Sequence, residues 1–163
     1  MDWNHYRFHT VWELTAPPDA VFAALERPVD YPLWWPQVRS VVQLDEERGT
    51  ARIRSFLPVG LTVTARAVRH DPVAGILEVR LGGDLEGWVR WTVTAGSGGA
   101  RAVYDQTVEV RKPLMRRLAP LCRPLFRANH AAMMRAGRRG LEGRLRPGRS
   151  GPAGAGERGP GEI

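Results

Sequence analysis

The sequence predicts an α+β domain in which one antiparallel sheet packs against a single long C-terminal helix. Apolar and polar residues alternate with a period of two through most of residues 6–111, which is typical of half-buried strands. The segments between these strands are short and rich in Gly, Pro and Asp, so they suit hairpin turns better than crossover helices. A long segment with helical periodicity then follows residue 112. This order of elements argues against a parallel sheet.

The first predicted elements are a strand, a short helix and an aromatic segment. Residues 6–14 alternate, and one face of this strand carries Phe8, Thr10, Trp12 and Leu14. The two prolines at 17–18 suit the first turn of a helix over residues 20–26, because that turn needs no backbone N–H. Pro28 ends this helix. The proline-bracketed segment 31–36 (YPLWWP) is predicted to be a loop or a helical turn.

Further strands are predicted before the C-terminal helix, separated by short turns. They cover residues 38–44, 50–56, 61–67, 77–81, 85–95 and 101–111. The glycine-rich segment 96–99 predicts a hairpin between the last two of them. One face of the last strand carries Tyr104, Gln106, Val108 and Val110.

The C-terminal helix opens at Lys112 and contains two prolines. Pro120 and Pro124 predict a kink or two helical pieces, with residues 125–145 as the best uninterrupted helix. At helical spacing the predicted inner stripe is Leu118, Cys122, Leu125, Asn129, Met133, Ala136 and Gly140. The predicted outer face is Arg116, Arg117, Arg123, Arg127, Arg135 and Arg138. From residue 146 the composition is mainly Gly, Pro, Arg, Ser and Ala, which predicts a folded domain over 1–145 and a disordered tail over 146–163.

The net charge of +7 is concentrated in the C-terminal helix, since residues 111–149 hold 12 basic side chains and one acidic one, Glu142. Three interpretations remain open. The arginines form a solvated face in an arginine-biased protein, or they dock to an acidic partner such as an acyl carrier protein or an anionic membrane surface. Nucleic acid is the least favoured partner, because basic charge alone gives nonspecific affinity and the sequence has no nucleic-acid motif.

The sequence also predicts a cytoplasmic location. No apolar run approaches the ~18 residues that a membrane-spanning helix needs. Residues 1–10 lack the apolar region of a secretory signal. The single cysteine, Cys122, has no partner within the chain for a disulfide.

Four stretches carry a resemblance to a known superfamily. They are 15–22 (TAPPDAVF), 31–38 (YPLWWPQV), 83–87 (GDLEG) followed by Trp91, and 112–130. In this order they resemble the helix-grip fold of the START-related superfamily (SRPBCC), in its branch of polyketide cyclase/dehydrase and lipid-transport proteins. The resemblance implies a curved antiparallel sheet of about seven strands wrapped around a long C-terminal helix. It also implies a cavity between them that holds lipids, sterols or polyketides.

Six residues are candidates for lining that cavity. Gln106 and Asn129 each interrupt an apolar face, and a buried amide without a partner costs about 1–3 kcal/mol. They either bond to each other or to water, or they orient a ligand carbonyl or hydroxyl. The other candidates supply apolar walls or simply belong to the core, and they are Trp35, Trp91, Tyr104 and Met133.

Two functions remain open. The first is noncatalytic binding of a bulky hydrophobic small molecule, and the alternative is a polyketide cyclase, aromatase or dehydratase with Tyr104 as its candidate proton donor. The strand alternation directs the charged side chains Arg52, Arg54, Arg66, Arg90, Asp105 and Glu109 outward. This leaves only Tyr104 and His130, at the edge of the inner stripe, as candidate acids or bases, unless a β-bulge turns Arg66 inward. The histidines and Cys122 show no metal-ligand spacing and no nucleotide motif is present, so neither a metal nor another cofactor is expected.

Overall fold

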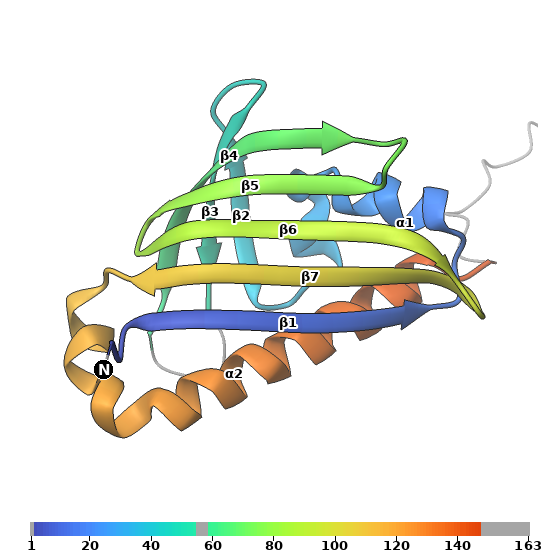
Figure 1. Cartoon of the computed structure of the whole chain (residues 1–163). Coiled ribbons are helices and arrows are strands. Elements are labelled where there is room, and N and C mark those ends of the chain that lie inside the picture. Colours follow the sequence, from blue (N-terminus) through green and yellow to red (C-terminus); the bar gives the residue numbers. More distant parts are fainter. Residues whose placement is uncertain (1, 55–58, 148–163) are drawn as a thin grey trace, which may run out of the picture.

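The chain folds into one seven-stranded antiparallel sheet that arches over a long helix (Figure 1). The computed structural model describes residues 2–54 and 59–147. The strands are β1 (His5–Leu14), β2 (Val38–Gln43), β3 (Arg48–Ile53), β4 (Leu61–Asp71), β5 (Ile76–Gly83), β6 (Leu85–Gly96) and β7 (Gly99–Val110). Their order in the sheet is β1-β7-β6-β5-β4-β3-β2, so the first strand pairs with the last. The fold class predicted from the sequence is confirmed.

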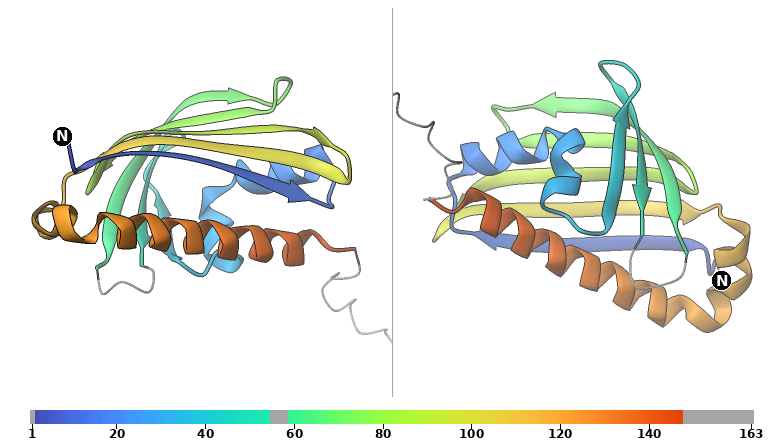
Figure 2. Two further views of the ribbon diagram at one scale, coloured as in Figure 1. Left: turned by 60° about the horizontal axis from the view of Figure 1, so that its bottom comes forward. Right: turned by 180° about the vertical axis from the view of Figure 1, so that it is seen from behind.

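The register of β1, β7 and β6 places the predicted apolar face on the inside of the arch. Tyr104 of β7 lies between Thr10 of β1 and Trp91 of β6. The side chains of Tyr104, Gln106 and Val108 are all buried, as the alternation of β7 predicts. In Figure 2 the sheet curves over the C-terminal helix, and its β2–β4 side turns down toward that helix.

Three helical elements complete the domain. They are α1 (Pro18–Leu25), the 3₁₀ helix η1 (Pro28–Leu33) and α2 (Pro113–Leu145). Helix α1 begins two residues earlier than predicted, because Pro18 occupies its first turn, where no N–H is needed. The aromatic segment forms η1, and Trp34 caps its end through a backbone bond to Tyr31. Figure 2 shows α1 and η1 near the C-terminal half of α2.

Helix α2 is one helix that continues through both internal prolines. Its first turns run at an angle to the rest in Figures 1 and 2, so the helix bends instead of dividing into two pieces. The tail predicted from residue 146 falls largely on residues 148–163, which lie outside the described residues.

The predicted inner face of α2 is wrong: most buried positions lie one residue after the predicted ones. The buried positions are Met115, Ala119, Phe126, Met134, Gly137 and Leu141. Leu118 and Leu125, which were expected inside, are 37% and 44% exposed. The physical reason lies at the contact with the aromatic segment. A Cβ atom on Gly137 would lie 2.5 Å from the Trp35 ring, so this helix face accepts the indole only at a glycine.

The core consists of two apolar clusters. The larger contains Trp12, Trp35, Trp91, Met134 and Leu141 and lies toward the C-terminal half of α2. The smaller contains Tyr6, Val108, Val110, Met115 and Phe126 and lies toward its N-terminal half. Each cluster joins the sheet to α2, so the helix closes the arch at both ends.

Candidate functional site

A polar cluster lies between the two apolar clusters and joins the sheet to α2. Gln106 is 6% exposed, and its Oε1 atom accepts a hydrogen bond of 2.8 Å from the Tyr104 hydroxyl. The same oxygen accepts a hydrogen bond of 3.0 Å from Nε2 of His130. One amide oxygen of β7 therefore holds two buried donors, one from its own strand and one from the helix.

The position of this cluster follows from the alternation of β7. Gln106 has Tyr104 two residues before it, in the larger apolar cluster, and Val108 two residues after it, in the smaller one. His130 enters from α2 and stacks on Phe8 of β1, with ring centroids 3.6 Å apart and planes inclined by 9°. The polar groups thus interrupt an otherwise apolar interior at the middle of the helix–sheet contact.

Burial keeps both titratable members of the cluster uncharged at neutral pH. Burial, with a smaller contribution from the Arg127 charge, lowers the pKa of His130 to about 4. Burial also raises the pKa of Tyr104 far above its ordinary value. The neutral imidazole that donates from Nε2 keeps a lone pair on Nδ1. The cluster is therefore arranged for hydrogen bonding between neutral groups.

Aromatic rings pack against the polar cluster on the side of the larger apolar cluster. The Trp91 ring packs against the Tyr104 ring with centroids 4.8 Å apart and planes inclined by 62°. On its other side Trp91 lies 4.8 Å from Trp12, which in turn meets Trp35 at 5.6 Å. These edge and tilted arrangements are the favourable ones for buried aromatic pairs.

Trp35 holds α2 against the aromatic segment. Its indole Nε1 donates a 2.9 Å hydrogen bond to the backbone oxygen of Met133, and its ring covers Gly137. The Met133 side chain packs on the larger apolar cluster. Of the predicted site residues, Trp91, Tyr104 and Gln106 thus meet at the polar cluster, while Trp35 and Met133 form the adjoining helix contact.

Asn129 does not pair with Gln106, which was one of its predicted alternatives. Its Oδ1 atom is buried and has no hydrogen-bond partner among the described residues. The neighbouring His130 makes the contact with Gln106 instead. The one-residue error in the rotation of α2 explains this difference, since it moves each predicted inward position to the next residue. The sequence pattern placed His130 at the edge of the inner stripe as a candidate acid or base, and the structure places it in contact with Gln106.

The charged strand residues point away from this site. Arg66 is exposed, and its Nε atom lies 3.9 Å from Oε2 of Glu47. The bulge in β4 comes after Arg66, between Ala67 and Arg69. Arg90 pairs with Glu78 at 2.9 Å on the outer surface of the sheet. The bulge in β4 therefore does not turn Arg66 toward the interior.

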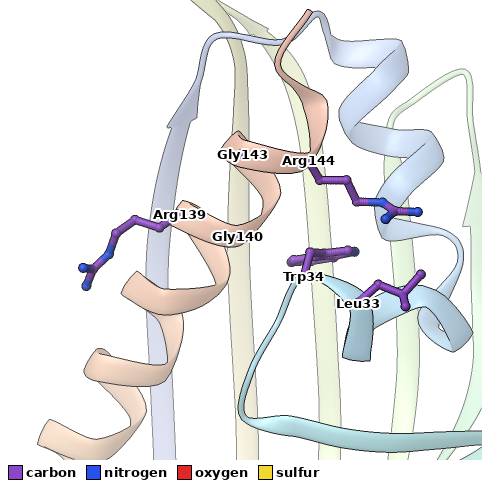
Figure 3. Close-up of a pocket in the computed structure, with 6 residues that line it drawn as sticks. All are labelled: Leu33, Trp34, Arg139, Gly140, Gly143 and Arg144. Carbon is purple, nitrogen blue, oxygen red and sulfur yellow. The ribbon is translucent and has the colours of Figure 1, made fainter. Parts of the chain in front are cut away.

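Two hollows open on the surface of the domain. One has a volume of about 360 Å³ and lies where η1 faces the last turns of α2. Figure 3 shows Arg144 extending toward Trp34 and Leu33 there, while Arg139 points away from them. The other, of about 350 Å³, lies on the outer face of β5–β7 beside Trp88. Neither of these two hollows lies between the sheet and α2.

Within residues 2–54 and 59–147, no group of three or more His, Cys, Asp or Glu side chains is placed to hold a metal ion. The same residues contain no helix that is both long and apolar enough to cross a bilayer.

The sequence matches the family described as polyketide cyclase / dehydrase and lipid transport over residues 5–146. The chain belongs to this family, whose members typically bind hydrophobic ligands. A comparison with curated proteins gives no match.

Solved structures with the same fold include proteins of several bacteria. The protein TTHA0849 from Thermus thermophilus is 18% identical with a TM-score of 0.68, covering 86% of this chain and 96% of that one. The Zhui aromatase/cyclase from a Streptomyces species is 15% identical with a TM-score of 0.66, covering 86% and 92%. A START superfamily protein from Mycobacterium smegmatis is 14% identical with a TM-score of 0.65, covering 86% and 96%. At these identities the likeness shows the helix-grip fold.

Proposed function

We propose that this protein binds a bulky hydrophobic small molecule, lipid-like or polyketide-like, between the sheet and α2. The observation that carries the proposal is the buried polar cluster of Tyr104, Gln106 and His130 between two apolar clusters. A ligand there would meet aromatic walls and a few oriented polar groups, which is the usual composition of small-molecule sites. We expect the protein to act in the cytoplasm, as its sequence predicts.

The polar cluster supports a ligand that carries both a carbonyl and a hydroxyl group. Gln106 Oε1 already accepts two hydrogen bonds, and neither of them uses the Nε2 group of this side chain. This amide N–H group would donate to a ligand carbonyl. The buried Oδ1 atom of Asn129 is an acceptor and would take a hydrogen bond from a ligand hydroxyl. Bonding to the ligand would remove the cost of leaving a buried amide unpaired.

The second candidate function is a polyketide cyclase, aromatase or dehydratase that uses the same site. The Zhui aromatase/cyclase shares the fold, and Tyr104 has a hydroxyl at the cluster. Proton transfer is favoured when the pKa of the acid or base lies near the working pH. Burial moves the pKa of Tyr104 upward and that of His130 to about 4, so both depart from that condition. Catalysis here would rely on positioning, and binding is the function that the cluster supports better.

Ligand exchange with two defined probes tests this proposal. The purified protein is titrated with the fluorescent probe 1-anilinonaphthalene-8-sulfonate, which oleate or the aromatic polyketide emodin should then displace. Gln106→Leu should weaken displacement by emodin by about tenfold, since it removes one oriented hydrogen bond. Gln43→Leu is the matched control, because Gln43 is an exposed glutamine of β2.

Failure would be visible in two independent measurements. If no probe binds and no apolar molecule co-purifies in native mass spectrometry, the binding proposal is wrong. If displacement is equal in wild type, Gln106→Leu and Gln43→Leu, the ligand binds elsewhere. For the enzymatic alternative, unchanged turnover of an identified substrate in Tyr104→Phe would remove its proposed proton donor.

A further inference from the structure

Four leucines lie on the outside of the first half of α2. Leu114 is 50% exposed, Leu118 37%, Leu121 87% and Leu125 44%. Their spacing of four, three and four residues places them on one stripe along the helix. Large apolar side chains grouped in this way mark interaction surfaces more often than single exposed ones do. We refer to these four residues as the leucine stripe.

The leucine stripe is not a partly covered edge of the core. The same turns of α2 bury Met115, Ala119 and Phe126 on a different side, and Met115 and Phe126 belong to the smaller apolar cluster. The helix therefore has two apolar faces in this half, and only one of them packs on the sheet. The first turns of α2 project at one end of the domain in Figure 2.

The surroundings of the leucine stripe are strongly cationic. Helix α2 carries eight arginines and one glutamate, Glu142. The Glu142 carboxylate accepts hydrogen bonds from the backbone N–H and the hydroxyl of Thr15. Arg117 lies beside the stripe, and Arg135 continues the same side of the helix. Neither of these two arginines forms an ion pair among the described residues, whereas Arg116 pairs with Glu109.

Charge decides between the occupants that this face could take. A second copy of the chain would bring two cationic helices together, which is electrostatically unfavourable. An acidic protein matches the positive charge of α2, but it does not match the exposed leucines unless its acidic surface is also apolar. A lipid surface with anionic headgroups matches both features, because leucines enter the acyl boundary and arginines remain with the phosphates.

We propose that the first half of α2 docks on an anionic membrane surface. The leucine stripe inserts at the boundary between headgroups and acyl chains, and Arg117 and Arg135 bind lipid phosphates. Helix α2 then lies in the plane of the membrane, with the sheet on its far side. This inference does not rest on the ligand site, because the leucine stripe faces away from Gln106 and His130.

Co-sedimentation with vesicles tests the proposal on the full chain. Vesicles of phosphatidylcholine with 30% phosphatidylglycerol are compared with pure phosphatidylcholine in 0.1 M salt. Binding to the anionic vesicles should be at least about tenfold tighter, since each basic residue near such a surface adds favourable energy. Leu118→Ser combined with Leu121→Ser should weaken that binding by about tenfold or more, because it removes two inserting side chains.

Matched controls separate the surface from general changes in charge and hydrophobicity. Val73→Ser removes a fully exposed apolar residue, 100% exposed in the β4–β5 turn, and should leave binding unchanged. Arg117→Gln with Arg135→Gln should weaken binding about tenfold. Arg7→Gln with Arg80→Gln removes the same charge from exposed positions of β1 and β5 and should have a smaller effect. Thermal unfolding of each variant shows whether it is folded.

Three outcomes would overturn the proposal. The first is equal binding to neutral and anionic vesicles, or no binding to either. The second is a dimer in solution that Leu121→Ser converts to a monomer, which would assign the face to a second copy. The third is saturable binding of a purified acyl carrier protein to this face without binding to vesicles, which would assign it to an acidic protein.

Discussion

His130 of α2 and Gln106 of β7 are joined by a hydrogen bond of 3.0 Å across the interior of the domain. This contact ties the middle of the helix to β7, the strand next to the edge strand β1. Because His130 also stacks on Phe8, three elements meet at one imidazole ring. The protonation state of that ring should therefore affect the stability of the whole fold.

The first prediction concerns pH. His130 has a pKa of about 4 in the folded state, below the ordinary value of 6.5. Between these values the unfolded chain binds a proton that the folded chain does not, so stability falls as pH falls from about 6.5 to about 4. The loss attributable to His130 should reach up to about 3 kcal/mol. Urea unfolding at pH 7 and pH 4.5 measures it.

The variant His130→Gln isolates this effect from other titrating groups. The variant should be less stable than wild type at pH 7, and the gap should shrink by about 2 kcal/mol at pH 4.5, because the variant lacks the titrating ring. A gap of equal size at both pH values would contradict a depressed pKa of His130.

The second prediction concerns Gln106. Replacement by Leu leaves the Tyr104 hydroxyl and the His130 Nε2–H group buried without their acceptor. The free energy of unfolding should fall by about 2–4 kcal/mol, since each unpaired buried donor carries a desolvation cost. Gln43→Leu on the exposed part of β2 should change it by less than about 0.5 kcal/mol. Equal effects in chemical denaturation would mean that Gln106 does not hold the two donors.

The third prediction concerns the glycines of α2. A methyl group on Gly140 would overlap the backbone carbonyl of Trp34, the residue shown beside it in Figure 3. Gly140→Ala should therefore destabilise the domain by about 1–3 kcal/mol, the usual cost of overpacking, although alanine favours a helix. At Gly143 a methyl group meets nothing within 4 Å, so Gly143→Ala should stabilise the domain by up to about 1 kcal/mol. Thermal unfolding distinguishes the two, and stabilisation by both would place Trp34 farther from the helix.

The sheet could be predicted from the sequence because the strands alternate with a period of two and the turns between them are rich in Gly, Pro and Asp. The alternation of β7 alone places Tyr104, Gln106 and Val108 on the inner face. The buried face of α2 could not be predicted from the sequence, because apolar residues lie on two faces of the helix and the pattern does not say which one meets the sheet. Leu118 and Phe126 are equally apolar, yet only Phe126 is buried.

The choice between the two faces depends on residues far away in the chain. Trp35 reaches the carbonyl of Met133 and covers Gly137, and these contacts set the rotation of the helix. No local pattern contains that information, since residues 98 positions apart in the sequence make the hydrogen bond. Asn129 was therefore predicted at a place that His130 occupies, while Gln106, which a strand positions, was found correctly in the interior.

The last prediction concerns Glu142, which joins the end of α2 to the end of β1. Its carboxylate accepts hydrogen bonds of 2.7 Å from both the backbone N–H and the hydroxyl of Thr15. Burial would raise the pKa of Glu142, but the Thr15 bonds and the charges of Arg138 and Arg146 more than offset it, so the pKa lies below its ordinary value. This stabilisation is present above the ordinary pKa and is lost as pH falls through the lowered one.

Glu142→Ala should accordingly lower the free energy of unfolding by about 1–2 kcal/mol at pH 7, because it removes two hydrogen bonds to a charged acceptor. Amide hydrogen exchange should speed up at Thr15 and in the last turn of α2, with little change at the centre of the sheet. Thr15→Val keeps the backbone bond and should have a smaller effect. Glu46→Ala, at an exposed position between β2 and β3, is the control for removing a negative charge. Uniform acceleration of exchange over the whole sheet would show that Glu142 supports global stability and not this joint alone.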